Sequence, residues 1–317
     1  MNWRYQVDHR VRSLDEVVEL AEDLVRRHGP YKVCVATAED VSGLGGLALG
    51  SERGLVEPIL IGHRRRIREA LEKIGVSRPG WRLIVEKDNP LATHRAARMV
   101  LSGRADILMR GKLLAREFLK ALLEPKLKVK KPGALWSNVV VISIDRLDRL
   151  LFLTDCAVVV KTDLAGRLRL IGNVLDFAAL LGVREPKVAL LAAVESVSPG
   201  MPVSLEEAVI AKMSERGQFP RGTQVDGPLS LDLAINPESV KKKGLTSPVA
   251  GNADILVLNN IGIGNILFKS MITLCGARSA SVVVGMPFPT VLTSRSEKPE
   301  NIIYSLALAI LMAGPKD

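Results

Sequence analysis

The chain of 317 residues is 47% hydrophobic and 25% charged, which is typical of globular proteins and leaves room for two domains. Aromatic residues make up only 4%, which argues against base-stacking surfaces for nucleic acid. The formal net charge of +10 favours an anionic ligand, although nucleic acid and membrane surfaces also attract a basic chain.

Cysteine and histidine usage indicates an intracellular protein without a metal centre. Cys34, Cys156 and Cys275 are far apart and near apolar stretches, which predicts buried, reduced thiols and a cytoplasmic location. The four histidines all lie in the first third, and no pair has metal-ligand spacing. The polar start predicts no signal peptide, and no apolar stretch reaches the length of a membrane span.

Expected strands and helices alternate almost throughout the chain, which predicts an α/β fold with mainly parallel sheets. The final helix is amphipathic and is expected to return to the first domain. In chain order, the expected elements are helix 14–28, strand 31–37, a helical segment to residue 50, strand 56–61, helix 64–74, strand 83–85, helix 90–101, strand 105–109, helix 113–123, strands 138–143, 150–153 and 156–160, helix 164–181, strand 187–194, helix 204–213, strand 253–258, a helix from 262 to about 276, strands 281–285 and 290–292, and a helix from 299.

The expected domains are residues 1–146 with 296–317, and residues 147–295. The Lys- and Pro-rich connection 124–133 lies near the first of these boundaries. Each domain is expected to form three layers, with helices on both faces of a sheet.

Two glycine-containing segments are candidates for phosphate binding. Gly43, Gly45 and Gly46 follow a strand, but they lack the ending of a P-loop, so close packing of a helix start is the alternative. Arg110-Gly111-Lys112 joins a buried strand to a helix, and ligands gather at the carboxyl ends of parallel strands. The alternative there is a glycine required by a tight turn and flanked by solvated charges.

A third candidate precedes the final helix, where Thr293, Ser294 and Arg295 follow a short β-branched strand. Free N–H groups at a helix start attract anions, and a guanidinium matches phosphate oxygens. The alternative is that a hydroxyl only caps the helix, in which Glu300 occupies the first turn.

Seven segments, in order over nearly the whole chain, resemble motifs of the phosphate acetyl/butyryltransferases, and the butyryl-type branch is the most similar. These segments are Ala105–Gly111, Leu151–Asp155, Glu185–Glu195, Val225–Leu229, Ser247–Gly251, Gly264–Leu267 and Val291–Arg295. The stretch Asn259–Asn265 departs from the family pattern by losing two acids, whereas the Thr-Ser-Arg core is intact.

The resemblance implies a fold like isocitrate and isopropylmalate dehydrogenase, with the active site in a cleft between two domains. It implies an enzyme that transfers a short acyl group, butyryl first, between coenzyme A and inorganic phosphate in a direct ternary complex. It also implies a homodimer or larger oligomer, a carboxylate kinase as metabolic neighbour, and coenzyme A as substrate with no cofactor.

The resemblance also implies residue roles. Arg295 is expected to hold the acyl phosphate, Ser294 to bind a developing oxyanion, and Glu300 to accept the thiol proton. Substrate-binding candidates are Thr293, Arg110, Gly111, Lys112, Asp155, Gly264 and Asn265. Asp155 could instead end its strand, and Asn265 could instead cap its helix.

Four other functions compete with phosphate butyryl transfer. A non-catalytic protein of this family that binds coenzyme A or acyl phosphate is one, and phosphate acetyltransferase is the nearest enzymatic alternative. A metal- and nicotinamide-dependent dehydrogenase would need clustered acids that the sequence lacks. Nucleic-acid binding would need a recognisable motif in addition to the charge.

Overall fold

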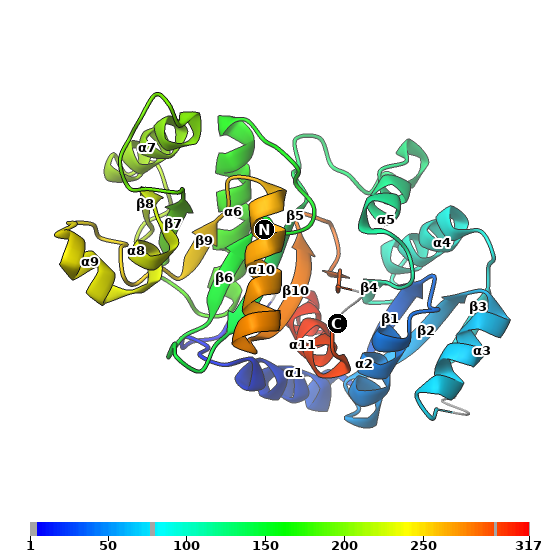
Figure 1. Ribbon diagram of the computed structural model, residues 1–317. Helices are drawn as coiled ribbons and strands as arrows, with labels where there is room; N and C mark the ends of the chain where they lie inside the picture. Colours follow the sequence, from blue (N-terminus) through cyan, green and yellow to red (C-terminus); the bar gives the residue numbers. More distant parts are fainter. Residues whose placement is uncertain (1–4, 77–79, 295–296, 317) are drawn as a thin grey trace. The chain divides into compact units, whose positions relative to one another are not determined.

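The computed structural model describes residues 5–76, 80–294 and 297–316 (Figure 1). Helices and strands alternate along the chain, as the apolar periodicity predicts. The fold divides into two compact units: a first unit of Leu14–Trp136 with Ser279–Asp317, and a second unit of Gln6–Ser13 with Ser137–Arg278. The predicted domain limits differ from these units at both boundaries, because the contacts group strand 137–143 with the second unit and strand 278–284 mainly with the first. The predicted limits and the predicted cleft stay predictions.

The first unit is built on six neighbouring strands in the order β3-β2-β1-β4-β11-β10. All neighbours are parallel except β10 and β11. The strands are β1 (Tyr31–Ala36), β2 (Val56–Gly62), β3 (Arg82–Val85), β4 (Ile107–Arg110), β10 (Arg278–Val284) and β11 (Thr290–Val291). Since β1 lies between β2 and β4, the strand order reverses at the carboxyl ends of β1 and β4, where open α/β sheets bind ligands.

Two groups of helices accompany these strands. In one group α1 packs on α11, α11 on α2 and α2 on α3; in the other, α4 packs on α5 and on β1. The helices are α1 (Leu14–His28), α2 (Val41–Glu52), α3 (Arg64–Lys73), α4 (Asn89–Leu101), α5 (Ala115–Leu122), α11 (Pro299–Ala313) and the short 3-10 helix η1 (Pro125–Leu127).

The glycines of α2 serve packing. A Cβ on Gly46 would lie 2.4 Å from Cβ of Ile302 on α11, so only glycine permits this approach. Asp40 caps α2 by accepting a hydrogen bond from the backbone N–H of Gly43 at 2.7 Å. The close-packing interpretation of these glycines is therefore confirmed.

The second unit has five neighbouring strands in the order β5-β6-β9-β7-β8. Only β5 and β6 are antiparallel. The elements are β5 (Ser137–Ser143), β6 (Leu151–Thr154), β7 (Lys187–Leu191), β8 (Gln224–Leu229), β9 (Ile255–Val257), α6 (Leu164–Leu180), α7 (Pro202–Glu215), α8 (Leu231–Ile235), α9 (Pro237–Lys243) and α10 (Ile261–Cys275).

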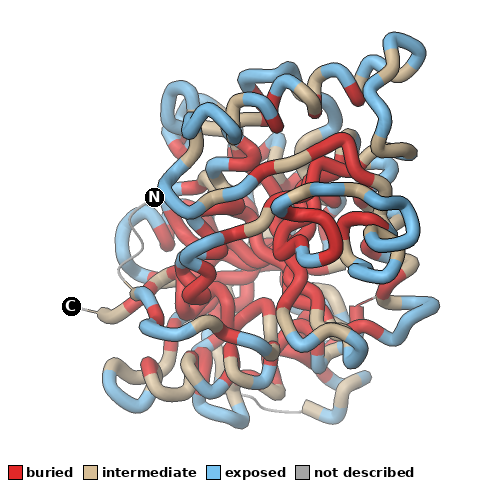
Figure 2. Tube along the Cα trace, turned by 90° about the vertical axis from the view of Figure 1, so that its left-hand side faces the viewer, coloured by how far each residue is buried: buried red, intermediate tan, exposed pale blue. Residues whose placement is uncertain are grey.

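The core of each unit consists of aliphatic residues from strands and helices. Buried residues are red in Figure 2. In the second unit, Phe152 of β6 meets Phe177 of α6 edge to face, with ring centroids 6.2 Å apart. Residues of α8 and α10, among them Leu233 and Phe268, belong to a cluster that also contains Leu153 of β6.

Several local predictions were wrong. The expected strand 156–160 is irregular, because the Asp155 carboxylate accepts the backbone N–H groups of Ala157 and Val158 and turns the chain there. The helix expected over 204–213 begins at Pro202, whose fixed φ suits the first turn. Cys34 and Cys156 are buried as expected, whereas Cys275 is exposed at the end of α10.

Candidate active site

The first unit places Gly111 and Lys112 against the end of β1. A Cβ on Gly111 would lie 2.1 Å from the carbonyl oxygen of Thr37, and the Lys112 N–H donates to that oxygen at 2.7 Å. Gly111 is therefore required for the close approach of two backbones, as the tight-turn interpretation holds. The exposed side chain of Lys112 extends from this turn.

Arg110 is not a solvated charge. Its side chain is 6% exposed, and its two terminal nitrogens donate to the backbone carbonyls of Leu113 and Thr293. In this structure the guanidinium links the segment after β4 to the segment after β11. Its predicted contact with phosphate or coenzyme A stays a prediction.

The peptide group between Thr293 and Ser294 is held at both ends by charged side chains. Its carbonyl accepts from Arg110, and its N–H donates to Oε2 of Glu297 at 2.9 Å. A cation therefore binds the negative end of the peptide dipole and a carboxylate the positive end. Rotating this peptide would place both charges against the wrong pole, so the backbone that carries Ser294 is fixed in one orientation.

Glu297 is a functional candidate that the sequence did not single out. Its side chain is 4% exposed, and its second oxygen accepts from the Ser279 hydroxyl at 2.9 Å. Burial raises the pKa of the Glu297 carboxyl, while the hydrogen bonds from Ser294 and Ser279 and the charge of Arg110 oppose that rise. The only signal in the sequence was its position three residues after Ser294.

The hydroxyl groups before α11 are not its cap. Lys298 is the N-cap residue and makes no side-chain capping bond, so the capping interpretation of Thr293 and Ser294 is wrong. Thr293 is buried and Ser294 half-buried. The predicted catalytic Arg295 lies outside the described residues.

Glu300, the predicted proton acceptor, lies on the exposed first turn of α11. It lines a pocket beside α1 together with Asp15 and Tyr304, whose hydroxyl donates to Asp15 at 2.9 Å. The carboxylate that contacts the Ser294 backbone is Glu297 instead. The role of Glu300 stays a prediction.

The second unit brings Asp155, Gly264 and Asn265 together after the carboxyl end of β6. A Cβ on Gly264 would lie 2.3 Å from the Asp155 carbonyl oxygen, so α10 packs directly on the segment after β6. The Asn265 side-chain amide donates to the carbonyl of Cys156 at 3.3 Å. Asn260, not Asn265, caps α10, so the capping alternative for Asn265 is wrong.

Asp155 is held by the backbone on several sides. Its carboxylate accepts the N–H groups of Asn138 at 2.6 Å and of Ala157 and Val158 at 2.7 Å. Burial raises the pKa of Asp155 against the effect of these bonds. Asp155 thus shapes the turn after β6, and its predicted role in orienting substrate stays a prediction.

Within residues 5–76, 80–294 and 297–316, no group of three or more His, Cys, Asp and Glu side chains is arranged to hold a metal ion. No helix in that part of the chain is long and apolar enough to cross a membrane.

The chain belongs to the phosphate acetyl/butaryl transferase family, whose sequence model matches residues 84–310. A phosphate butyryltransferase from Clostridium acetobutylicum is 36% identical over 306 residues, covering 96% of this chain and 100% of that protein. A phosphate acetyltransferase from Thermotoga maritima is 34% identical over 302 residues, covering 95% of this chain and 99% of that protein. Among solved structures, a branched-chain phosphotransacylase from Enterococcus faecalis V583 has a TM-score of 0.76 and 28% identity, covering 90% of this chain and 100% of that chain.

These comparisons confirm the family predicted from the seven ordered segments, and with it the expectation of an enzyme of the acyltransferase class. The structural match confirms the predicted two-part α/β architecture.

Proposed function

We propose that this protein transfers a short acyl group, butyryl in the first place, between coenzyme A and inorganic phosphate in a direct ternary complex. The observation that carries the proposal is the near-full-length match to a phosphate butyryltransferase, combined with an intact Thr293-Ser294-Arg295 core. A phosphate oxygen attacks the thioester carbonyl, the tetrahedral intermediate collapses, and the thiolate of coenzyme A leaves and is protonated.

The clamped peptide group supports a specific role for Ser294 in this reaction. Catalysis without a covalent nucleophile depends on donors that are held in place before charge develops. The hydroxyl of Ser294 is such a donor, since Arg110 and Glu297 fix the backbone that carries it. Arg295 supplies the positive charge for the phosphoryl oxygens, as the family pattern implies.

The proposal is tested by mixing the purified protein with phosphate and acyl-CoAs from acetyl to hexanoyl and following thiol release. Phosphate-dependent release with butyryl-CoA as the best substrate is expected, whereas acetyl-CoA as the best would indicate a phosphate acetyltransferase. Arg295→Ala should lower release by about a hundredfold or more, and the exposed Arg65→Ala serves as the matched control. Binding of coenzyme A without release for any chain length would instead identify a non-catalytic binding protein.

We further propose a homo-oligomer in the cytoplasm, with a carboxylate kinase as metabolic neighbour. Helix α10 supports self-association, because Ile263, Ile266 and Leu274 on it are 45%, 69% and 81% exposed. The three unpaired cysteines support a reducing compartment. Light scattering should give at least twice the chain mass of 34.4 kDa, and a mass equal to one chain would contradict the oligomer.

A further inference from the structure

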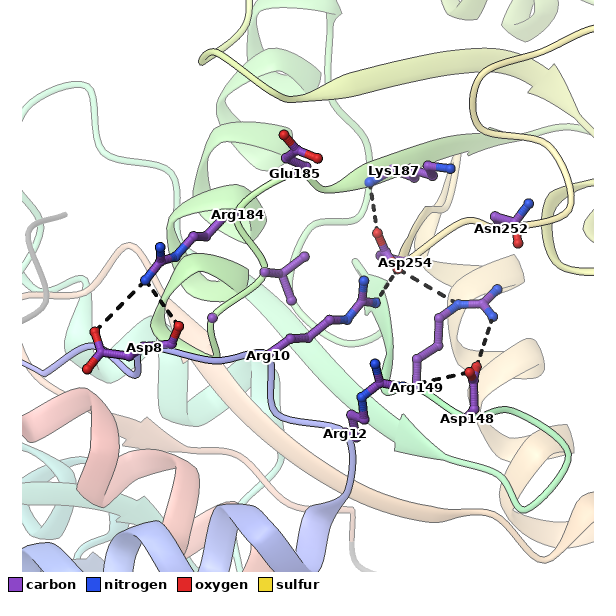
Figure 3. A pocket seen from close by; sticks show the side chains of 12 residues that line it. Asp8, Arg10, Arg12, Asp148, Arg149, Arg184, Glu185, Lys187, Asn252 and Asp254 are labelled. Carbon is purple, nitrogen blue, oxygen red and sulfur yellow. Dashed lines mark hydrogen bonds and ion pairs between the residues drawn. The ribbon is translucent and has the colours of Figure 1, made fainter.

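The second unit contains a polar pocket that none of the predicted site residues lines (Figure 3). Its volume is about 670 Å³, which lies within the range of about 300–1,000 Å³ for small-molecule sites. Its charged lining residues are Asp8, Arg10, Arg12, Asp148, Arg149, Arg184, Glu185, Lys187 and Asp254.

The pocket lies at the amino ends of three parallel strands. Arg149 precedes β6 closely, Asp254 directly precedes β9, and Lys187 is the first residue of β7. Strands β6, β9 and β7 are parallel neighbours, so these three residues share one edge of the sheet. Asp155 and Asn265 follow the carboxyl ends of β6 and β9, so they belong to the opposite edge. The pocket is therefore separate from the substrate-binding candidates of this unit.

The floor of the pocket holds more positive than negative charge. Asp254 is 2% exposed and accepts hydrogen bonds from the Arg10 guanidinium and from the Lys187 backbone N–H, the latter at 3.0 Å. Nε of Arg149 lies 3.8 Å from the same carboxylate. Two guanidinium groups thus share one buried carboxylate.

Arg149 retains binding capacity. Its Nε donates to the carbonyl of Ala253 at 3.2 Å, and its Nη1 lies 3.7 Å from Asp148. Its Nη2 is buried and has no hydrogen-bond partner among the described residues. A buried donor without a partner is costly, and an anion that reached it would remove that cost.

The rim adds cations that an anion can recruit at little cost. The side chains of Arg12 and Arg184 are 67% and 71% exposed, and they pair with Asp148 and Asp8, which are 82% and 108% exposed. Such exposed pairs contribute little to stability, so they can open without leaving a buried charge. In Figure 3, Arg184 lies on one side of Arg10, and Arg12 and Arg149 lie on the other side. The cations are therefore spread across the pocket rather than gathered at one point.

We propose that this pocket binds a small polyanion with two or more linked phosphate groups, either a nucleoside polyphosphate or an inorganic polyphosphate. A single phosphate would meet only part of the spread of cations, whereas a linked chain of phosphates meets Arg184, Arg10 and Arg149 together. Planar guanidinium groups suit phosphate oxygens, and the volume leaves room for a nucleoside.

The test is calorimetric titration of the full-length protein and of its Arg295→Ala variant with tripolyphosphate, ATP and AMP. Arg295 belongs to the proposed substrate site, so binding that is unchanged in Arg295→Ala belongs elsewhere. The Arg12→Gln/Arg184→Gln double variant removes two rim cations without breaking the buried Arg10–Asp254 pair. The Arg65→Gln/Arg98→Gln double variant removes the same charge from exposed positions of the first unit.

The expected result is one site per chain for tripolyphosphate or ATP, unchanged in Arg295→Ala. The pocket variant should weaken binding about tenfold or more, and the control variant less than about twofold. Tighter binding of ATP than of tripolyphosphate would identify a nucleotide site, and the reverse an inorganic polyphosphate site. Absence of binding, loss of binding in Arg295→Ala, AMP binding as tightly as ATP, or equal weakening in the pocket and control variants would each overturn the proposal.

Discussion

Replacing Glu297 tests whether the clamped peptide group controls both stability and catalysis. Glu297→Ala removes the acceptor of the Ser294 N–H and that of the fully buried Ser279 hydroxyl. A hydrogen bond to a charged acceptor contributes about 1.5–3 kcal/mol, and leaving a buried hydroxyl unpaired costs about 1–3 kcal/mol. Relief of the buried charge offsets part of this loss, so we expect Glu297→Ala to lower the free energy of unfolding by about 3 kcal/mol.

Glu297→Gln separates the hydrogen bonds from the charge. The amide oxygen can accept from the Ser294 N–H, and the amide nitrogen can donate to the Ser279 hydroxyl, which is able to accept. We therefore expect stability within about 1 kcal/mol of the parent protein. The two variants should also differ in kcat, because a released loop misplaces Ser294. We expect Glu297→Ala to lower kcat about tenfold to a hundredfold and Glu297→Gln to lower it much less.

The charge of Glu297 also predicts a pH dependence. Burial raises the pKa of Glu297 in the folded state. The contribution of Glu297 to the free energy of unfolding is therefore fully present below the ordinary pKa of a glutamate, and it is lost as pH rises through the raised pKa. Glu297→Gln should remove this decline. Urea unfolding at several pH values and thiol-release kinetics measure both effects, with the exposed Glu69→Ala as control. Parental stability and kcat in Glu297→Ala, or equal losses in both Glu297 variants, would refute the reasoning.

Three further outcomes are expected. Burial raises the pKa of Glu207, beside Arg167, to about 7. The contribution of Glu207 to the free energy of unfolding is therefore fully present below about pH 4.5, and it falls by about 3 kcal/mol as pH rises through 7. Urea unfolding of Glu207→Gln should lack that decline, and an unchanged pH profile would contradict it. Gly46→Ala should lower the unfolding free energy by about 1–3 kcal/mol through overpacking, whereas Gly172→Ala, which has open space on α6, should raise it by about 0.5–1 kcal/mol; equal effects in thermal melts would refute the packing argument. Glu300→Gln should slow acyl-CoA formation about a hundredfold if Glu300 accepts the thiol proton, and parental rates across the pH range would exclude that role.

The sequence predicted the order of elements because that information is local. Apolar periods of two and of about 3.6 residues distinguish strands from helices without knowledge of distant contacts. The misread strand after Asp155 has the opposite origin: its apolar residues favour a strand, but the Asp155 carboxylate binds the following N–H groups and stops the extended chain. A side chain that competes for the backbone is hard to foresee, since the same aspartate could equally end its strand without forming those bonds.

Candidate-site residues were foreseeable where a short motif carries them, and hidden where the fold assembles them. Ser294 and Arg110 stand in recognisable segments, so they were named. Glu297 owes its place to Ser279 on β10 and to the loop after β11 that Arg110 holds. Those partners are distant in sequence, and a glutamate near a helix start reads as a favourable surface charge.

Arg110 shows that a residue in an anion-site pattern can also have a structural role. A basic residue beside a glycine at a strand end predicts phosphate binding, and at 6% exposure the guanidinium also has to place its terminal donors on acceptors within the protein. It does so on the carbonyls of Leu113 and Thr293, and Glu297 takes the N–H of the same peptide group. The two buried charges partly neutralise each other through the peptide dipole between them, so neither remains unpaired. The terminal nitrogens of Arg110 therefore hold this loop, while its predicted contact with phosphate or coenzyme A stays a prediction, as do those of Lys112 and Arg295.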